Sequence, residues 1–164
     1  LSTNEFKQIT AYNYYSGLPE WSPDGKQIAY VANPDGQIGL FIMDLDSRIQ
    51  KSLVTMTKNI HALELLSISW SPDGEKLAFT MEVNGIFNIC VINSNGENLI
   101  NLTKSNDFHN YAPSWSPCGT KIAFVSMQEG KDDIYIMNSD GTHTNKITSG
   151  DANNKYPIWV TVVK

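Results

Sequence analysis

Aromatic and histidine side chains gather in four short polar segments of this 164-residue chain. The segments read AYNYYSGL (11–18), KNIHALEL (58–65), KSNDFHNYA (104–112) and GDANNKY (150–156). Their rings belong to Tyr12, Tyr14, Tyr15, His61, Phe108, His109, Tyr111 and Tyr156. Rigid rings among adaptable Asn and Asp side chains are typical of surfaces that bind proteins or carbohydrates. The segments are therefore a candidate ligand-binding surface, and the alternative is that their rings complete the packing of the core.

The two histidines of these segments raise the question of a metal site. His61 and His109 occupy corresponding segments, and Asp107 lies beside His109. Imidazole and carboxylate groups together can bind a divalent ion. No third histidine and no clear general base accompanies them in these segments. We therefore predict no metal site and no cofactor.

The usual catalytic motifs are missing from the sequence. It has no Gly-x-Ser-x-Gly elbow, no phosphate-binding glycine loop and no His-Glu-x-x-His pair. The segments NSNGE (93–97) and NSDGT (138–142) partly imitate a calcium loop, but both lack its acidic first ligand and its distal Glu. We expect these two segments to be hairpin turns, and we predict no catalytic residue.

Composition narrows the classes of partner. The net charge of −5 is spread along the chain without a basic run, so nucleic acid is not an expected partner. No stretch approaches the roughly 20 apolar residues of a membrane span. The first ten residues lack the layout of a signal peptide. Cys90 and Cys118 are expected to be free thiols, which leaves the compartment open.

An internal repeat must position the four segments. Trp21, Trp70, Trp115 and Trp159 follow one another at intervals of 49, 45 and 44 residues. A second marker, an apolar residue followed by Thr, recurs at 9–10, 56–57, 102–103 and 147–148. A period in the mid-forties fits either helical pairs or four-stranded propeller blades.

Local patterning favours the blades. Short runs such as QIAYVA, KLAFTM and KIAFVS alternate large and small apolar residues with period two, as expected for a sheet packed on both faces. No window carries a helical stripe. Each repeat is predicted to be a four-stranded antiparallel sheet, and the blades to span 17–57, 65–103 and 111–148. Segments 4–10 and 156–163 match single strands of incomplete blades.

The residues after each Trp predict a reusable hairpin. Ser-Pro-Asp-Gly places Pro where φ is fixed, Asp where it can accept a backbone hydrogen bond, and Gly where φ is positive. The turn residues are Asp24 and Gly25, Asp73 and Gly74, and Gly119 after Cys118. Cys118 replaces the Asp, which should weaken the side-chain bond and leave Gly119 to make the bend. The tryptophans are expected to pack where adjacent blades meet.

These residues resemble a known family. WSPDGKQIAY, WSPDGEKLAF and WSPCGTKIAF, each followed by an IYIMNSDG-like strand and a KIT-like strand, are similar to TolB-like β-propeller repeats. Such repeats also occur in the propeller domains of prolyl-oligopeptidase-type and tricorn-type peptidases and in oligogalacturonate lyases. The resemblance implies an all-β propeller and a periplasmic or otherwise secreted protein. A shared fold is evidence for the architecture of a protein rather than for its function.

Two functions stay open at this point. The resemblance to TolB implies a non-catalytic binding module or scaffold for a protein or peptide. The alternative is the propeller of a larger enzyme, either a peptidase gating domain or a lyase-like metal site that uses His61 and His109. The first is preferred because it requires no catalytic residue.

The number of strands raises a question of closure. About three and a half blades cannot close a ring, because propellers typically have four to eight blades. The arc would be about half of a six-bladed or seven-bladed ring, and its bare ends would expose apolar faces and strand edges. We therefore expect self-association into a homodimer, and the rival explanation is that the chain is a fragment of a longer propeller.

Overall fold

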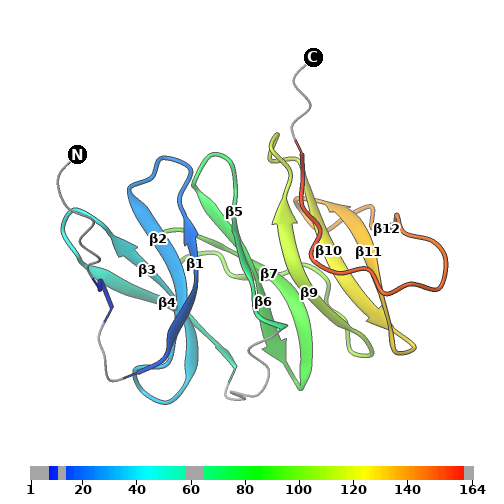
Figure 1. The fold of residues 1–164 in the computed structure, drawn as a ribbon, viewed down its shortest axis with the longest axis horizontal. Coiled ribbons are helices and arrows are strands. Elements are labelled where there is room, and N and C mark those ends of the chain that lie inside the picture. Colours follow the sequence, from blue (N-terminus) through cyan, green and yellow to red (C-terminus); the bar gives the residue numbers. More distant parts are fainter. Residues whose placement is uncertain (1–7, 11–13, 58–64, 161–164) are drawn as a thin grey trace.

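The computed structural model describes residues 8–10, 14–57 and 65–160. In this part of the chain twelve strands form three separate four-stranded antiparallel sheets (Figure 1). Blade 1 contains β1 (Ser16–Trp21), β2 (Gln27–Ala32), β3 (Ile38–Asp44) and β4 (Gln50–Thr57). Blade 2 contains β5 (Ile68–Trp70), β6 (Lys76–Val83), β7 (Ile86–Asn93) and β8 (Ile100–Asn101). Blade 3 contains β9 (His109–Trp115), β10 (Lys121–Gln128), β11 (Lys131–Asn138) and β12 (Asn145–Lys146).

The predicted all-β architecture is confirmed. Strands follow their chain order within every sheet, and the first strands β1, β5 and β9 contact one another in turn, so the blades form an open arc (Figure 1). Residues 8–10 and 156–160 flank the arc without being assigned to strands. Within the described residues, no helix has the length and apolar character needed to cross a membrane.

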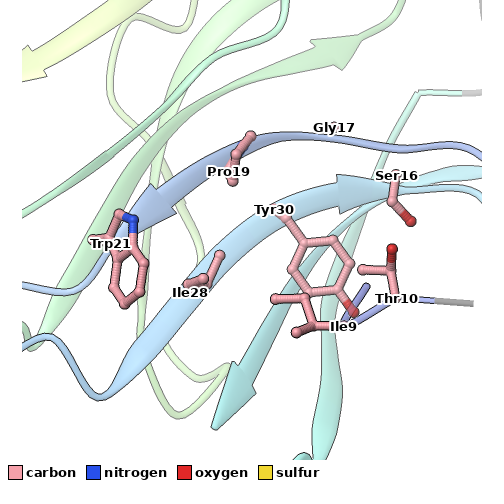
Figure 2. A pocket seen from close by; sticks show the side chains of 8 residues that line it. All are labelled: Ile9, Thr10, Ser16, Gly17, Pro19, Trp21, Ile28 and Tyr30. Atoms are coloured by element: carbon pink, nitrogen blue, oxygen red, sulfur yellow. The ribbon is translucent and has the colours of Figure 1, made fainter. Parts of the chain in front are cut away.

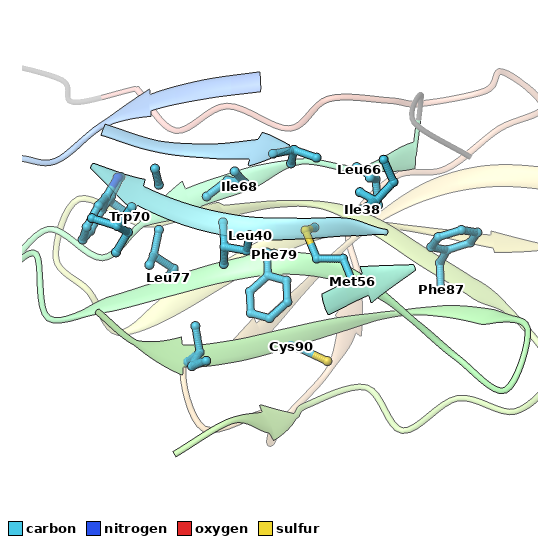
Figure 3. Close-up of a cluster of buried hydrophobic side chains, with 14 residues drawn as sticks. Ile38, Leu40, Met56, Leu66, Ile68, Trp70, Leu77, Phe79, Phe87 and Cys90 are labelled. Atoms are coloured by element: carbon cyan, nitrogen blue, oxygen red, sulfur yellow. The ribbon is translucent and has the colours of Figure 1, made fainter. Parts of the chain in front are cut away.

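The core lies between the blades, where large and small side chains alternate as predicted. Ala29 and Val31 of β2 share one buried cluster with Leu77 and Phe79 of β6 (Figure 3). In the second junction, Ala78 shares a cluster with large apolar residues of β10 and β11. Large side chains of one sheet therefore fill the space left by small residues of its neighbour.

The Ser-Pro-Asp-Gly turns have the hydrogen bonds that their sequence predicts. In the first turn, Gln27 N donates to Ser22 Oγ at 2.9 Å, and Lys26 N donates to Asp24 Oδ1 at 3.1 Å. Ser22 Oγ also donates to Asp24 Oδ1 at 2.7 Å, and these bonds lower the pKa of the Asp24 carboxyl. The turn after Trp70 repeats the same pattern through Ser71.

The third turn shows what Cys118 changes. The Sγ atom of Cys118 lies 3.5 Å from Ser116 Oγ and 3.0 Å from Thr120 Oγ1, in place of the shorter carboxylate bonds. These contacts lower the pKa of the exposed Cys118 thiol to about 7. Gly119 still bends the chain with φ of 71°, as Gly25 does with the same value. The predicted bend at Gly119 is therefore retained although Cys118 replaces the Asp, and the weakening of the side-chain bond stays a prediction.

The tryptophans join consecutive blades. Trp70 and Trp115 are each 8% exposed and belong to the clusters between blades. The Nε1 atom of Trp159 donates to Ser114 O at 2.9 Å. Trp21 differs, because it is 61% exposed and no blade precedes it in the described chain. The predicted packing role therefore holds at the two internal junctions.

The apolar-Thr marker has a hydrogen-bonding function in two blades. Ile89 N donates to Thr103 Oγ1 at 3.1 Å, and the hydroxyl of Thr103 donates to Asn88 Oδ1 at 2.8 Å. Blade 3 repeats this pattern. Ile134 N donates to Thr148 Oγ1 at 3.0 Å, and the hydroxyl of Thr148 donates to Asp133 Oδ1 at 2.8 Å. The threonine hydroxyl thus continues the hydrogen bonding of the sheet beyond β8 and β12.

Gly25→Val is expected to destabilise the protein by about 1 kcal/mol or more, because a β-branched residue is strained at positive φ. Nothing lies within 4 Å of a Cβ built at Gly25, so the backbone conformation alone should carry the cost. Gly25→Asn is the matched control and should cost less, since Asn tolerates this conformation. Equal urea midpoints for the wild type and Gly25→Val would contradict the turn assignment.

Candidate functional site

The first aromatic segment packs on blade 1. Tyr14 is partly buried against the cluster that contains Ile28 and Tyr30. Tyr15 is 39% exposed, its backbone N–H donates to Asn33 Oδ1 at 2.8 Å, and its ring covers β1 at Gly17. Tyr12 lies outside the described residues. Of this segment, Tyr15 presents the accessible ring.

His109 is held by blade 2. Its Nδ1 atom accepts a hydrogen bond from Phe87 N at 3.2 Å, and its ring centroid lies 5.5 Å from that of Phe87. One ring nitrogen is therefore already bound to backbone. His61 lies outside the described residues, and in residues 8–10, 14–57 and 65–160 no three His, Cys, Asp or Glu side chains form a metal-binding group.

Tyr111 belongs to the packing between structural elements. It is 3% exposed, and its hydroxyl donates to Asp132 Oδ1 at 2.6 Å. Lys155 Nζ lies 3.2 Å from the other oxygen of Asp132, so one buried carboxylate links β9, β11 and the C-terminal segment. Its burial assigns the Tyr111 ring to the core. Tyr156, next to Lys155, is 66% exposed.

Phe108 opens onto a groove between blades 2 and 3. The groove has a volume of about 320 Å³, and every residue that lines it is uncharged. The lining consists of Leu102, Thr103, Ser105, Phe108, Asn110, Phe124, Ser126, Gln128, Tyr135, Gly141 and Thr144. Phe124 and Tyr135 are stacked, with centroids 5.8 Å apart and planes inclined by 27°. This groove is the candidate functional site.

Two polar atoms of the groove are available to a ligand. The amide of Asn110 donates to Phe108 O at 3.0 Å, and that of Gln128 donates to Ser126 Oγ at 3.2 Å. Their oxygens, Asn110 Oδ1 and Gln128 Oε1, have no hydrogen-bond partner within the described part of the chain. Asn110 is 4% exposed, so its position is fixed. The groove thus offers one fixed acceptor, on Asn110, and a second acceptor, on the half-buried Gln128, beside aromatic rings.

Comparison of the repeats explains why this junction is polar. At the positions of Ser126 and Tyr135, blade 2 has Met81 and Cys90, which pack in the cluster between blades 1 and 2. A methionine side chain fills irregular space, whereas a serine leaves it open. Ser126 is smaller than Met81, so blade 3 has more open space at this position of the groove.

Sequence reasoning found the segment that contains Phe108 but missed the part of the groove that the strands of blade 3 contribute. Ser126 and Tyr135 belong to strands β10 and β11, whereas the prediction considered only the segments between blades, of which 104–112 supplies Ser105, Phe108 and Asn110. A usable signal was present, because Ser126 is the polar residue at a position where the other blades carry Ala32 and Met81. Alignment of the three repeats would have identified Ser126 as the exception.

Asp133 gives blade 3 a pH-dependent contact close to Tyr135. Its carboxylate accepts hydrogen bonds from Lys146 Nζ at 2.5 Å and from Thr148 Oγ1 at 2.8 Å. The bond from Lys146, followed by that from Thr148, lowers the pKa of Asp133 below its usual value of about 3.9. The charged carboxylate therefore stabilises the fold above about pH 4, and this contribution is lost as the pH falls through the lowered pKa.

Asp133→Asn is expected to lower stability at pH 7 and to flatten the loss of stability between about pH 5 and pH 3. Asn at this position retains an acceptor for Thr148, as Asn88 does for Thr103. Urea unfolding midpoints measured across this range test the prediction. Asp35→Asn, at an exposed turn carboxylate, is the control for the change in net charge. Parallel pH curves for Asp133→Asn and the wild type would contradict it.

Comparison with known proteins identifies the repeat. Residues 1–103 match the family PD40, described as the TolB beta propeller domain. The crystal structure of TolB from Acinetobacter baumannii superposes with a TM-score of 0.78 at 21% sequence identity, and a putative TolB from Agrobacterium tumefaciens does so with 0.71 at 25%. A puromycin-hydrolysing peptidase of Mycobacterium tuberculosis gives a TM-score of 0.64 at 12% identity. Comparison with curated protein sequences gives no match.

The matches differ in how much of each protein they include. The match to the Acinetobacter protein covers 94% of this chain and 37% of that protein. The match to the Agrobacterium protein covers 84% of this chain and 50% of that protein. The match to the peptidase covers 85% of this chain and 22% of the peptidase. The chain therefore spans half or less of the length of these proteins. At these identities, the likeness to the Acinetobacter protein and to the peptidase supports the fold.

Proposed function

Because this chain belongs to the PD40 family of TolB beta propeller domains, we propose that it is a non-catalytic binding module for protein or peptide partners. The observation that carries the proposal is the uncharged groove between blades 2 and 3. Its acceptors, Asn110 Oδ1 and Gln128 Oε1, suit the backbone N–H groups of an extended peptide. Phe108 and Tyr135 supply an aromatic surface for one apolar side chain of that peptide.

A displayed library of random heptapeptides tests this function. We expect enrichment of neutral peptides that contain an aromatic or aliphatic residue, and their capture should change little between about 0.05 M and 0.5 M salt because the groove carries no charge. Phe108→Ala and Gln128→Ala should each weaken capture at least tenfold. Ile49→Ala is the matched control, since Ile49 is an exposed apolar residue on the turn of blade 1.

Two outcomes would overturn the proposal. Peptides that bind all variants equally would place the contact outside the groove. Failure to enrich peptides, combined with binding of neutral oligosaccharides on a glycan array that Phe108→Ala abolishes, would assign the groove to carbohydrate. Circular dichroism spectra of the variants establish that the comparison concerns folded protein.

A second candidate is the propeller domain of a larger enzyme. The superposition with the Mycobacterium tuberculosis peptidase, of which the match covers 22%, favours this reading. In such an enzyme the groove would contact a substrate, and the catalytic residues would belong to another domain. The gene sequence on either side of this chain tests it, because a peptidase requires an encoded Ser/His/Asp domain.

The likeness to TolB also supports a periplasmic or otherwise secreted location. Cold osmotic shock of the source cells should release the chain with periplasmic markers. Its retention with cytoplasmic markers would reject this location.

A further inference from the structure

Three polar side chains form a stripe on the face of blade 3 that lines the groove. Asn110 of β9 lies directly opposite Ser126 of β10, and Gln128 follows two positions later in β10. Residues two positions apart in a strand point to the same face of the sheet. We call Asn110, Ser126 and Gln128 the polar stripe, and all three line the groove.

The other blades do not repeat the polar stripe. At the same distances from the tryptophan of the repeat, blade 2 has Leu65, Met81 and Val83, and blade 1 has Ser16, Ala32 and Pro34. Leu65 and Met81 pack against the buried cluster between blades 1 and 2. Figure 2 shows Ser16 with Tyr30 in the pocket of blade 1, whose described lining contains neither Asn nor Gln. Amide side chains at these positions are therefore particular to blade 3.

The polar stripe offers two hydrogen-bond acceptors and one donor. Asn110 Oδ1 and Gln128 Oε1 are the acceptors described above. Ser126 Oγ is bound by the Gln128 amide, but its own O–H donates to no atom of the described residues. Asn110 is 4% and Ser126 is 2% exposed. Buried polar groups normally have a hydrogen-bond partner, so these groups point to a ligand that donates twice and accepts once.

A primary carboxamide has the complementary pattern. Its NH₂ group carries two donors, and its carbonyl oxygen accepts. A backbone amide or a hydroxyl has one donor, and a carboxylate has none. Among the side chains of a peptide, those of Gln and Asn therefore match all three groups of the polar stripe.

The charges beside the polar stripe favour a neutral carboxamide over a carboxylate. Asp133 lies opposite Ser126 in the pairing of β10 with β11. Lys146 Nζ donates to Asp133 at 2.5 Å, and Lys131 Nζ donates to Gly150 O. Both lysines are thus already engaged. A ligand carboxylate would face the amide oxygens of the polar stripe without gaining a free cation.

We propose that the groove selects peptides with a Gln or Asn side chain, whose carboxamide binds the polar stripe. This specificity rests on the proposed function as a peptide-binding module. The carboxamide N–H groups donate to Asn110 Oδ1 and Gln128 Oε1, and its carbonyl accepts the Ser126 O–H. Each amide oxygen has two lone pairs, so it can accept a backbone N–H as well.

The aromatic residue of the same peptide lies two positions from the Gln or Asn. Alternate side chains of an extended peptide point to one side, so both can enter the groove together. The carboxamide then contacts the polar stripe, and the aromatic ring contacts Phe108 and Tyr135, which line the same groove.

Synthetic heptapeptides test this specificity. Each is built on alanine and carries Phe and one variable residue two positions apart, in both orders. Acetyl and N-methylamide ends ensure that no terminal primary carboxamide is present. By isothermal titration calorimetry, we expect a Gln or Asn peptide to bind at least about tenfold more tightly than the matched Met, Leu and Glu peptides.

Variants of the polar stripe test which residues read the carboxamide. Gln128→Val introduces the blade 2 residue and should bring the ratio of Gln-peptide to Met-peptide affinity below about three. Ser126→Ala removes the donor and should also lower this ratio. Gln37→Val, at an exposed glutamine outside the groove, is the matched control and should leave the ratio unchanged. Circular dichroism establishes that each variant is folded.

The outcomes separate this specificity from the proposed function. Binding that requires Phe108 but is equally tight for the Gln, Asn, Met and Leu peptides would overturn the specificity alone. A Glu peptide that binds as tightly as the Gln peptide would do the same. If no peptide binds in a way that depends on Phe108, both the specificity and the proposed function are wrong.

Discussion

Tyr111→Ala is expected to lower the free energy of unfolding by about 3 to 5 kcal/mol, the range for removing a large buried aromatic side chain. Tyr111 is 3% exposed and packs with Val125 and Ala112. Truncation leaves a cavity between these residues, and it also removes the 2.6 Å hydrogen bond to Asp132. Asp132 is 5% exposed, so its carboxylate would lose a donor in a place with little access to water.

Three urea unfolding curves separate these contributions. Tyr111→Phe keeps the ring and removes only the hydroxyl, and it should cost about 1 to 2 kcal/mol. Tyr156→Ala is the matched control, because this ring is 66% exposed and its loss should change stability by less than about 0.5 kcal/mol. A small effect of Tyr111→Ala, similar to that of Tyr156→Ala, would contradict the assignment of Tyr111 to the core.

Asn88→Asp is expected to cost about 3 kcal/mol or more, because it places an unpaired carboxylate in a fully buried site. The Oδ1 atom of Asn88 accepts hydrogen bonds from Ser105 N and Thr103 Oγ1, at 2.7 and 2.8 Å. Its Nδ2 atom donates to the carbonyls of Ile86 and Ser105. A carboxylate retains the acceptor contacts but sets a second oxygen against two carbonyl oxygens.

Blade 3 indicates how this cost can be recovered. It carries Asp133 at the position of Asn88 and Lys146 at the position of Asn101, and Lys146 Nζ donates to Asp133 at 2.5 Å. Adding Asn101→Lys to Asn88→Asp should therefore restore at least about 1 kcal/mol. Asn101→Lys alone should cost about 1 kcal/mol, because Lys104 N loses its acceptor.

A double-mutant cycle by urea unfolding measures this coupling. Additive effects of the two substitutions would show that the lysine does not reach the carboxylate in blade 2. Asn88→Ala is a useful third variant. It removes the amide without adding charge, so its cost reports the lost hydrogen-bond partners of Ser105, Thr103 and Ile86 together with the cavity left by the side chain.

The fold could be predicted from the sequence because the repeat is encoded locally. Ser22, Asp24 and Gly25 lie within four positions, and the hydrogen bonds of the turn depend only on these residues and on the strand that follows. The same residues recur in the second turn, and the third turn keeps the Ser and the Gly with Cys118 in place of Asp. The alternation of large and small residues, such as Tyr30 beside Ala29, also fixes both faces of a strand without knowledge of its neighbours.

The candidate site could not be predicted in the same way. The burial of Tyr111 depends on Asp132, which is 21 positions away, and on the path of the C-terminal segment. The groove depends on Ser126 and Tyr135 facing blade 2, which only the packing of two sheets determines. Residue type identified Phe108 as a candidate, but a strand residue such as Ser126 gives no comparable signal within its own repeat.

The unequal covering of the three blades has a consequence for local unfolding. Blade 2 is packed on both sides, by β4 of blade 1 against β6 and by β9 of blade 3 against β7. In repeat proteins stability is distributed between neighbouring units, so a unit with two neighbours opens last. Backbone amides in β6 and β7 should therefore exchange hydrogen with solvent most slowly. Exchange should quicken toward β1 and toward residues 150–160, so the chain comes apart from its ends and blade 2 is the last to open.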